Sequence, residues 1–141
     1  MRCLGLDLGS KTLGIAISDR TNFIASVYKT IFFKDEDYSS LIEPLKEIVK
    51  NEDIGTIVLG LPKNMNNSLG TRAMITLEFK EMLENNFHIP VILEDERLTS
   101  VISNNILISA NVSRNKRKKK VDGMAAEIIL QGYLDRVRKE N

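Results

Sequence analysis

Carboxylate side chains occur at three separate places in the 141-residue sequence, each beside residues that suit chemistry on a phosphate. In the first, between Gly5 and Gly14, Asp7 alternates with leucines on a strand that we expect to be central. Burying a lone carboxylate there costs several kcal/mol, so a bound divalent cation is expected to neutralise it. Lys11 lies in the same stretch, where it could contact a phosphate. A hydrogen-bonded aspartate in a hairpin turn would fit the pattern too.

The second stretch, Glu94-Asp95-Glu96-Arg97, follows a short apolar run that predicts a parallel strand. Open α/β sheets bind their ligands at the carboxyl ends of such strands. Because alternate strand residues face opposite sides, Asp95 is not expected to share a face with Glu94 and Glu96. The alternative is a cluster of acids at the start of a helix, where the helix dipole favours negative charge.

The third carboxylate, Asp122, directly follows a basic run and precedes an amphipathic pattern. Small residues at Gly123, Ala125 and Ala126 would let a helix that begins near Asp122 press closely on a sheet. An aspartate at this position could also be an ordinary helix N-cap.

Much of the positive charge of the chain is concentrated in this basic run. The net charge is +1, but without the six cations of this run the chain has 14 basic and 19 acidic residues. We expect a cationic loop at about residues 112–121 that contacts the phosphates of a nucleic acid, although a solvated charge run is the alternative. The cations are Arg114, Lys116, Arg117, Lys118, Lys119 and Lys120.

Composition excludes several other kinds of site. With one cysteine, Cys3, and one histidine, His88, the chain can form neither a disulfide framework nor a Cys/His zinc site, so any metal must be held by oxygen ligands. The single histidine also disfavours Ser-His-Asp and Cys-His mechanisms. No apolar window is long enough to span a membrane and the first residues are not typical of a signal peptide, so we expect no membrane partner and a cytoplasmic protein.

The apolar spacing predicts one α/β domain over residues 1–141. The order is strand, strand, strand, helix, strand, helix, strand, helix, helix, which favours a mixed five-stranded sheet with helices on both faces. An opening hairpin is followed by a third strand. The later elements are predicted at residues 24–33, 38–50, 56–61, 71–85, 90–93 and 98–109, with a last helix from about residue 122.

Taken together, these motifs resemble the YqgF-type (RuvX-like) family, described as Holliday junction resolvases and as nucleases of pre-16S ribosomal RNA processing. The resemblance extends over essentially the whole chain. It rests on Gly5-Leu6-Asp7-Leu8-Gly9-Ser10-Lys11, Gly14-Ile15-Ala16-Ile17-Ser18-Asp19, Val58-Leu59-Gly60-Leu61-Pro62, Asp95-Glu96-Arg97-Leu98-Thr99, Val121-Asp122 and Ile129-Leu130-Gln131-Gly132-Tyr133-Leu134.

The resemblance implies a ribonuclease H-like fold in which Asp7, Glu96 and Asp122 bind metal and catalyse phosphodiester hydrolysis. It implies Mg²⁺ as cofactor, with Mn²⁺ as a substitute, and an activity in 5′-end processing of pre-16S ribosomal RNA. Lys11, Arg97 and the basic run would hold the substrate backbone. Structured RNA is the expected partner, with pre-ribosomal particles as a further one; the sequence does not set the oligomeric state.

Three other functions fit parts of the pattern. The chain could be a Holliday junction resolvase acting on branched DNA, or a non-catalytic nucleic-acid-binding module of the same fold. The stretch from Asp7 to Thr12 could also form a loop around nucleotide phosphates, as in an actin-like or Hsp70-like ATPase. Such ATPases close two related domains around the nucleotide, whereas 141 residues supply one, and neither nucleotide-binding glycine motif is present.

Overall fold

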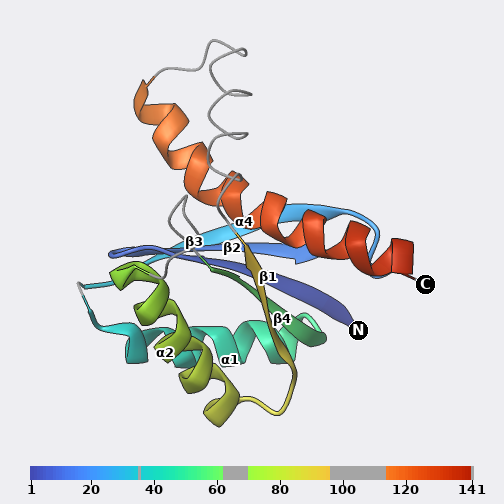
Figure 1. The fold of residues 1–141 in the computed structure, drawn as a ribbon, viewed down its shortest axis with the longest axis horizontal. Coiled ribbons are helices and arrows are strands. Elements are labelled where there is room, and N and C mark those ends of the chain that lie inside the picture. The colour runs from blue at the N-terminus through green and yellow to red at the C-terminus, as the bar shows by residue number, and fades with distance from the viewer. Residues whose placement is uncertain (35, 62–69, 96–113, 141) are drawn as a thin grey trace.

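The computed structural model describes residues 1–34, 36–61, 70–95 and 114–140, and for residues 95, 114–123 and 138–140 it describes the backbone alone. Five strands, a 3-10 turn and three α-helices occur in these ranges (Figure 1). Their order along the chain is β1 (Arg2–Leu8), β2 (Thr12–Ser18), β3 (Ala25–Phe32), η1 (Tyr38–Leu41), α1 (Ile42–Asn51), β4 (Ile54–Leu61), α2 (Thr71–Asn86), β5 (Val91–Asp95) and α4 (Arg114–Glu140).

The strands form one mixed sheet in the order β3-β2-β1-β4-β5. β1 pairs antiparallel with β2 and parallel with β4, and β4 pairs parallel with β5. β1 is therefore the central strand, as its apolar residues predict, and β1, β4 and β5 all end at the same edge of the sheet.

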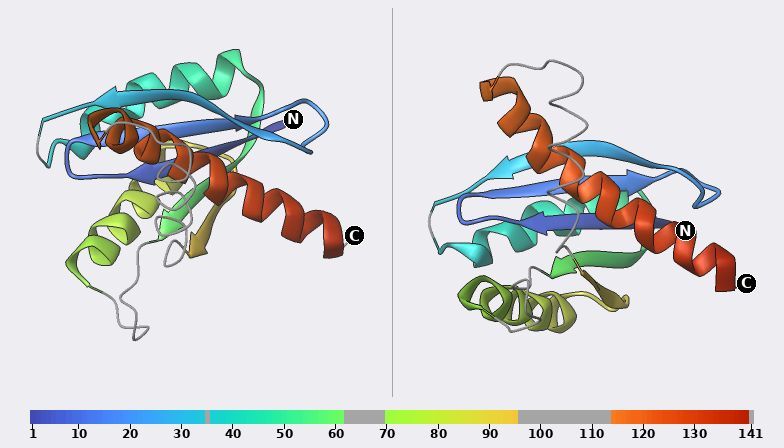
Figure 2. Two further views of the ribbon diagram at one scale, coloured as in Figure 1. Left: turned by 90° about the horizontal axis from the view of Figure 1, so that it is seen from above. Right: turned by 45° about the horizontal axis from the view of Figure 1, so that its top comes forward.

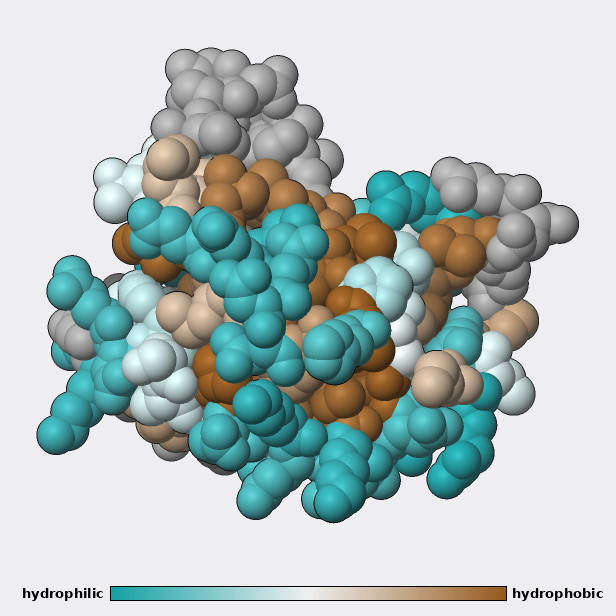
Figure 3. All heavy atoms as spheres, turned by 90° about the horizontal axis from the view of Figure 1, so that it is seen from below, coloured by the Kyte–Doolittle hydropathy of each residue, from teal (hydrophilic) through white to brown (hydrophobic). Residues whose placement is uncertain are grey.

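Helices cover both faces of the sheet, each over its own core. On one face α1 and α2 enclose a large cluster that includes Leu4, Leu6 and Leu8 of β1. On the other face α4 crosses β1, β2 and β3 and encloses a smaller cluster with Cys3 of β1. Figure 2 shows this arrangement from two directions, and Figure 3 shows hydrophilic side chains around apolar ones on the α1 and α2 side.

The contact between β1 and α4 depends on a glycine. A Cβ atom on Gly5 would lie 2.7 Å from Cβ of Leu130 and 3.0 Å from the carbonyl oxygen of Ala126, so only glycine lets the helix backbone approach the strand this closely. Farther along α4, Leu134 and Cys3 line the same cavity near the beginning of β1. α4 therefore runs antiparallel to β1, as Figure 1 also shows.

The predicted elements that lie on described residues are confirmed with shifts of a few residues, except at the basic run. That run was predicted to be a loop over residues 112–121, and this is wrong, because α4 begins at Arg114 and all six cations lie on its first two turns. Lysine and arginine are good helix formers, and no glycine or proline interrupts the run.

The helix predicted over residues 98–109 lies outside the described residues. Among the helices that are described, none combines the length and the apolar character that crossing a membrane requires.

Candidate metal and nucleic-acid site

Asp7 lies at the edge where the three parallel strands end. It stands opposite Gly14 of β2. Leu6 pairs with Leu59 of β4, so the same register continued by one residue places Asp7 in one row with Gly60, which pairs with Glu94 of β5. Its strand neighbours Leu6 and Leu8 belong to the core under α1 and α2. Because strand residues alternate, the half-buried Asp7 side chain is on the α4 face of the sheet.

No hydrogen bond or ion pair joins the Asp7 carboxylate to another group of the described residues. A half-buried carboxylate with no partner in the described part of the chain can accept a ligand through its oxygen atoms. Aspartate oxygens are the ligands that Mg²⁺ prefers. The only thiol, Cys3, is buried near the other end of β1, and burial raises its pKa, so it is unsuited to a metal at the Asp7 end.

Glu94 stands in the same row as Asp7, but it is already paired. Its Oε1 lies 2.8 Å from a terminal guanidinium nitrogen of Arg136, and its side chain is only 15% exposed. Arg136 in turn lies over the Tyr133 ring at 5.7 Å from the centroid. Glu94 therefore fastens the end of β5 to α4. No sequence pattern indicates this pair, because its partners are far apart in the chain.

Asp122 is described as part of the α4 backbone only. It lies one turn before Ala126, which packs over Gly5. Because α4 runs antiparallel to β1, that turn lies toward the end of β1 where Asp7 is located. Glu96 and Arg97 lie outside the described residues, and the described part of β5 ends one residue earlier, at Asp95. Within the described part of the chain, no three metal-binding side chains form a group.

Lys11 is exposed in the tight turn between β1 and β2. The turn is closed by the backbone N–H of Gly9, which donates to the carbonyl oxygen of Thr12 at 2.7 Å. The carbonyl oxygen of Lys11 accepts a hydrogen bond from the N–H of Phe33 at 2.9 Å, so the end of β3 lies beside this turn. The lysine therefore lies at the same end of the sheet as Asp7.

The basic first turns of α4 rise away from the sheet at this end of the molecule (Figures 1 and 2). Placed there, Arg114 and Lys116 to Lys120 form a cationic projection rather than a loop. A projecting helix with this charge suits phosphate contacts as well as a loop does.

Arg72 is a residue at this edge that sequence reasoning missed. It lies in the first turn of α2, and a terminal nitrogen of its guanidinium donates to the carbonyl oxygen of Leu8 at 2.5 Å. The bond holds the last residue of β1, directly after Asp7. The only sequence signal for Arg72 is its position shortly after residues 62–69, which follow the carboxyl end of β4.

Two described side chains at this edge suit chemistry on a phosphate. Asp7 has a carboxylate with no partner among the described residues, and Lys11 has an exposed positive charge in the turn after β1. A carboxylate oxygen is the kind of ligand that a hard divalent cation takes. Cations around it would hold an anionic polymer, not a neutral substrate.

Comparisons with known proteins agree with this geometry. A family model described as "RuvX: Holliday junction resolvase" matches residues 1–136. Relatives from Bacillus subtilis and Bacillus licheniformis, each named "Putative pre-16S rRNA nuclease", are 48% and 50% identical to this chain over 135 residues. The matches cover 96% of this chain and 98% and 97% of the relatives.

Two solved structures have a similar fold. Thermus thermophilus RuvC, in complex with a Holliday junction substrate, has a TM-score of 0.61 at 12% identity and covers 97% of this chain and 96% of its own. The fowlpox virus resolvase, in complex with Holliday junction DNA, has a TM-score of 0.55 at 15% identity and covers 97% and 99%. These similarities confirm the predicted ribonuclease H-like fold.

Proposed function

The chain belongs to the RuvX family, and from this we propose that it is a nuclease that hydrolyses RNA phosphodiesters with Mg²⁺ held by Asp7, Glu96 and Asp122. The observation that carries the proposal is the Asp7 carboxylate, half-buried at the edge where β1, β4 and β5 end and without a described partner. Such a carboxylate is costly to keep unless a ligand neutralises it.

Two features of the fold support Glu96 and Asp122 as the other ligands. Asp122 lies in the turn of α4 before Ala126, toward the Asp7 end of β1. Glu96 is the next residue after the described end of β5, a strand that ends at the same edge as β1. With Glu94 paired to Arg136, Glu96 is the remaining glutamate of that segment for the role.

The chemistry follows from charge. Three carboxylates close together repel one another, so they favour a site that a cation neutralises. A bound Mg²⁺ supplies an activated water and stabilises the leaving oxygen of a phosphodiester. The protein groups orient the substrate: Lys11, Arg97 and the cationic turns of α4 would hold the phosphate backbone, and Arg72 keeps the end of β1 in place.

We propose structured ribosomal RNA precursor as the substrate, with cleavage in 5′-end processing of pre-16S RNA and pre-ribosomal particles as partners. The relatives named for this activity are 48% and 50% identical over nearly the whole chain. The solved resolvases are only 12% and 15% identical, so they carry the fold but not the substrate. Branched DNA is the second candidate, because the family model is described as a Holliday junction resolvase.

The test is cleavage by purified protein of an RNA that spans the 5′ end of 16S RNA, beside a four-way DNA junction, with and without Mg²⁺. We expect Mg²⁺-dependent cutting of the RNA. Asp7→Asn should lower the rate by at least about 100-fold, the scale of losing one electrostatic stabiliser, while RNA binding persists.

Asp53→Asn is the matched control for this substitution. Asp53 is exposed before β4 and has a φ of 53°, a left-handed conformation that asparagine adopts readily, so this variant should cut normally. Equal cutting by the wild type and Asp7→Asn would contradict the catalytic assignment. Binding without cutting by both proteins would favour a non-catalytic RNA-binding module.

A further inference from the structure

Phe32 is an aromatic side chain that the fold exposes almost completely. At 75% exposure it exceeds every other exposed large apolar side chain of the described residues except Met1, at 78%. It is the last residue of β3, an edge strand of the sheet. Single exposed apolar residues are common on protein surfaces, so exposure alone assigns Phe32 no role.

The register of the sheet places Phe32 on the same face as Asp7. Asp7 stands opposite Gly14, and Gly14 stands opposite Thr30 of β3. Phe32 is two residues beyond Thr30, so its side chain is on the same face, and the irregularity in the β2–β3 pairing lies elsewhere, between Ile15 and Ala16.

The two residues are also close. Phe32 is two strands across from Asp7 and two residues along, which with ordinary strand spacing and rise puts the Cα atoms about 12 Å apart. A nucleic-acid strand covers such a distance within a few nucleotides. A strand whose phosphate lies at Asp7 can therefore bring one of its next bases over Phe32.

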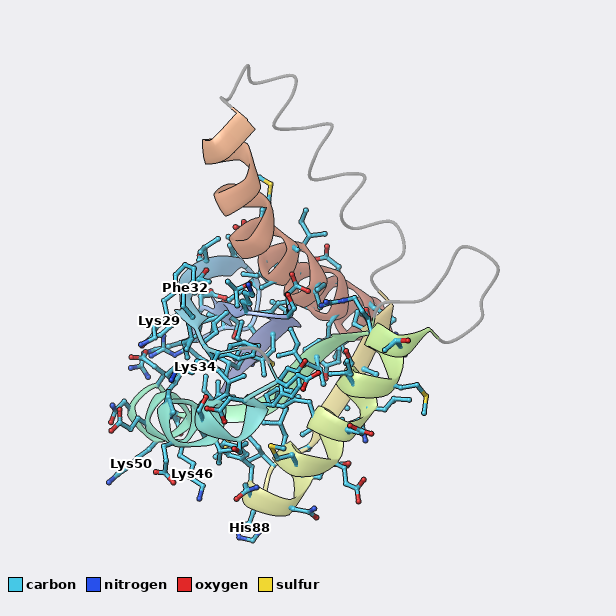
Figure 4. All side chains as sticks on the ribbon, turned by 90° about the vertical axis from the view of Figure 1, so that its left-hand side faces the viewer. Lys29, Phe32, Lys34, Lys46, Lys50 and His88 are labelled. Atoms are coloured by element: carbon cyan, nitrogen blue, oxygen red, sulfur yellow. The ribbon has the colours of Figure 1, made fainter. Side chains whose placement is uncertain are left out.

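Three lysines lie near the end of β3 that carries Phe32. Lys11 lies in the neighbouring turn, Lys34 lies just beyond the end of β3, and Lys29 faces the opposite side of the same strand, across from Ile15. All three are exposed, and no ion pair with a described residue neutralises them. Figure 4 shows Lys29 and Lys34 near Phe32 on one side of the molecule.

The lysines of α1, also labelled in Figure 4, differ from these three. Lys46 and Lys50 alternate with Glu43 and Glu47 on the exposed side of the helix, so that surface has no excess of positive charge. At the Phe32 end of β3 the exposed Glu36 and Asp37 follow Lys34, so what distinguishes this end is the exposed aromatic side chain near lysines and not an excess of positive charge. An exposed aromatic ring near lysines can bind unpaired nucleotides, because bases stack on the ring and phosphates pair with the lysines.

We propose that Phe32, with Lys11 and Lys34, binds an unpaired nucleotide of the substrate strand close to the scissile phosphate. The occupant is single-stranded RNA, and the inference rests on the proposed nuclease function only for the position of the scissile phosphate at Asp7. Phe32 is then a specificity residue: it favours substrates in which the strand beside the cleavage site is unpaired, since a base held in a duplex cannot stack on it.

The test uses short single-stranded RNA with 2-aminopurine in place of one adenine, bound to protein carrying Asp7→Asn so that nothing is cut. We expect a change of 2-aminopurine fluorescence on binding. Phe32→Ala in this background should abolish the change and weaken binding roughly 10-fold, as expected for the loss of one stacked base. Phe32→Trp should retain both, whereas binding of a blunt RNA duplex should be equal in all variants.

Phe23→Ala is the matched control, because Phe23 is also aromatic and 53% exposed but lies before β3, at the other end of that strand. It should bind like the parent. Three results would overturn the proposal: equal binding by Phe32→Ala, an equal loss of duplex binding, or a change from dimer to monomer in Phe32→Ala. The last would assign the edge strand to contact with a second copy.

Failure of the stacking surface and failure of the nuclease function can be told apart. Wild-type protein that cuts RNA with Mg²⁺ while Phe32→Ala binds and cuts equally well overturns the stacking surface alone. A Phe32-dependent fluorescence change in a protein that cuts no RNA supports the stacking surface and overturns the nuclease function.

Discussion

The two ends of β1 use polar residues in opposite ways. At its beginning, the N–H of Cys3 donates to Oγ of Ser18 at 2.8 Å, Ser18 donates to Oδ1 of Asn22 at 2.7 Å, and Nδ2 of Asn22 donates to the carbonyl oxygen of Met1 at 2.9 Å. At its end, Asp7 has no partner among the described residues, and cations are exposed around it.

Asp19 and Asp7 show the same difference between two residues of one type. The Asp19 carboxylate accepts hydrogen bonds from the N–H of Ile24 at 3.0 Å, from the Thr21 hydroxyl and from the N–H of Phe23 at 2.7 Å. These bonds, with that from Ile24 the most important, lower the pKa of Asp19 to about 2. One aspartate thus stabilises a turn, whereas the carboxylate of the other has no partner among the described residues.

The difference shows which polar residues carry function. A polar group satisfied within the protein stabilises the fold, and its substitution costs stability. A polar group at a strand end that has no hydrogen-bond partner in the described fold lowers the stability of the protein. Such a group is retained where binding of a ligand offsets the loss. Substitutions at the end of β1, around Asp7, should therefore change RNA binding and cutting. Substitutions at its beginning, around Ser18 and Asp19, should change the free energy of unfolding.

The largest effect is expected from the cationic turns of α4. Replacing Lys118, Lys119 and Lys120 by Ser removes three positive charges, so RNA binding should fall roughly 10-fold or more at low salt, and the slope of log affinity against log salt should flatten by up to about three units. Binding of different sequences should weaken alike. Filter binding or anisotropy over a salt series measures this.

The control for the lysine triple variant is Lys46→Ser with Lys50→Ser, on the exposed side of α1, where glutamates alternate with the lysines. This pair should leave the salt slope almost unchanged. An unchanged slope in the α4 variant would remove these turns from the RNA interface and leave the Asp7 end without its main source of positive charge.

A smaller effect is expected between the two ends, where α4 touches β1. Gly5→Ala puts a Cβ atom 2.7 Å from Leu130 and 3.0 Å from the Ala126 carbonyl oxygen, so the helix must shift, and stability should fall by roughly 1–3 kcal/mol. The Mg²⁺-induced rise in melting temperature should fall too, because α4 carries Asp122. Calorimetry with and without Mg²⁺ measures both.

Gly132→Ala on the same helix is the control for Gly5→Ala. A Cβ atom there meets only Oε2 of Glu94, at 4.0 Å, and alanine favours a helix over glycine by about 1 kcal/mol, so stability should rise slightly. If Gly5→Ala were as stable as Gly132→Ala, the close approach of α4 to β1 would be wrong.

The smallest effect is expected at the beginning of β1, where the polar groups are hydrogen-bonded, and this effect depends on pH. Because the folded-state pKa of Asp19, about 2, lies below the ordinary value of 3.8, its charge stabilises the fold above about pH 4, and this contribution is lost as the pH falls through about 2. Asp19→Asn should therefore lower the melting temperature at pH 7, and the difference from wild type should shrink between pH 4 and pH 2.

Cutting measured on the same Asp19→Asn protein should remain near the wild-type rate at a temperature where it is folded. A melting difference that stays constant down to pH 2 would show that the carboxylate charge has no part in the turn. Loss of cutting in folded Asp19→Asn would contradict the division of labour between the two ends of β1.

Much of the fold could be predicted from local patterns. The period-2 spacing of Leu4, Leu6 and Leu8 predicts β1, and the tight turn after it predicts the pairing with β2, because strand register follows alternation. The order of strands and helices then favours a mixed sheet covered on both faces. These features depend on short-range chemistry, which is why a sequence shows them.

The errors came from competition between local and distant effects. The basic run was expected to be a loop because it precedes the amphipathic pattern that begins near Asp122, but helix propensity and the anchoring of α4 through Ala126 and Leu130 extend the helix back to Arg114. The Glu94–Arg136 pair and the bond from Arg72 to Leu8 join residues distant in sequence, so no spacing rule could predict them.

For the candidate site, the sequence predicted which residue types to expect, and the fold adds where the described ones lie. Asp7 is on the predicted central strand, near its carboxyl end, and Lys11 is in the turn of the predicted opening hairpin. The predicted convergence of Glu96 and Asp122 on Asp7 remains a prediction.

That convergence is the central claim, and a crystal of the chain soaked in Mn²⁺ tests it most directly. We expect an anomalous difference peak within bonding distance of oxygens of Asp7, Glu96 and Asp122 in the wild type and no peak in Asp7→Asn. Carboxylates that point apart, with no peak between them, would contradict it.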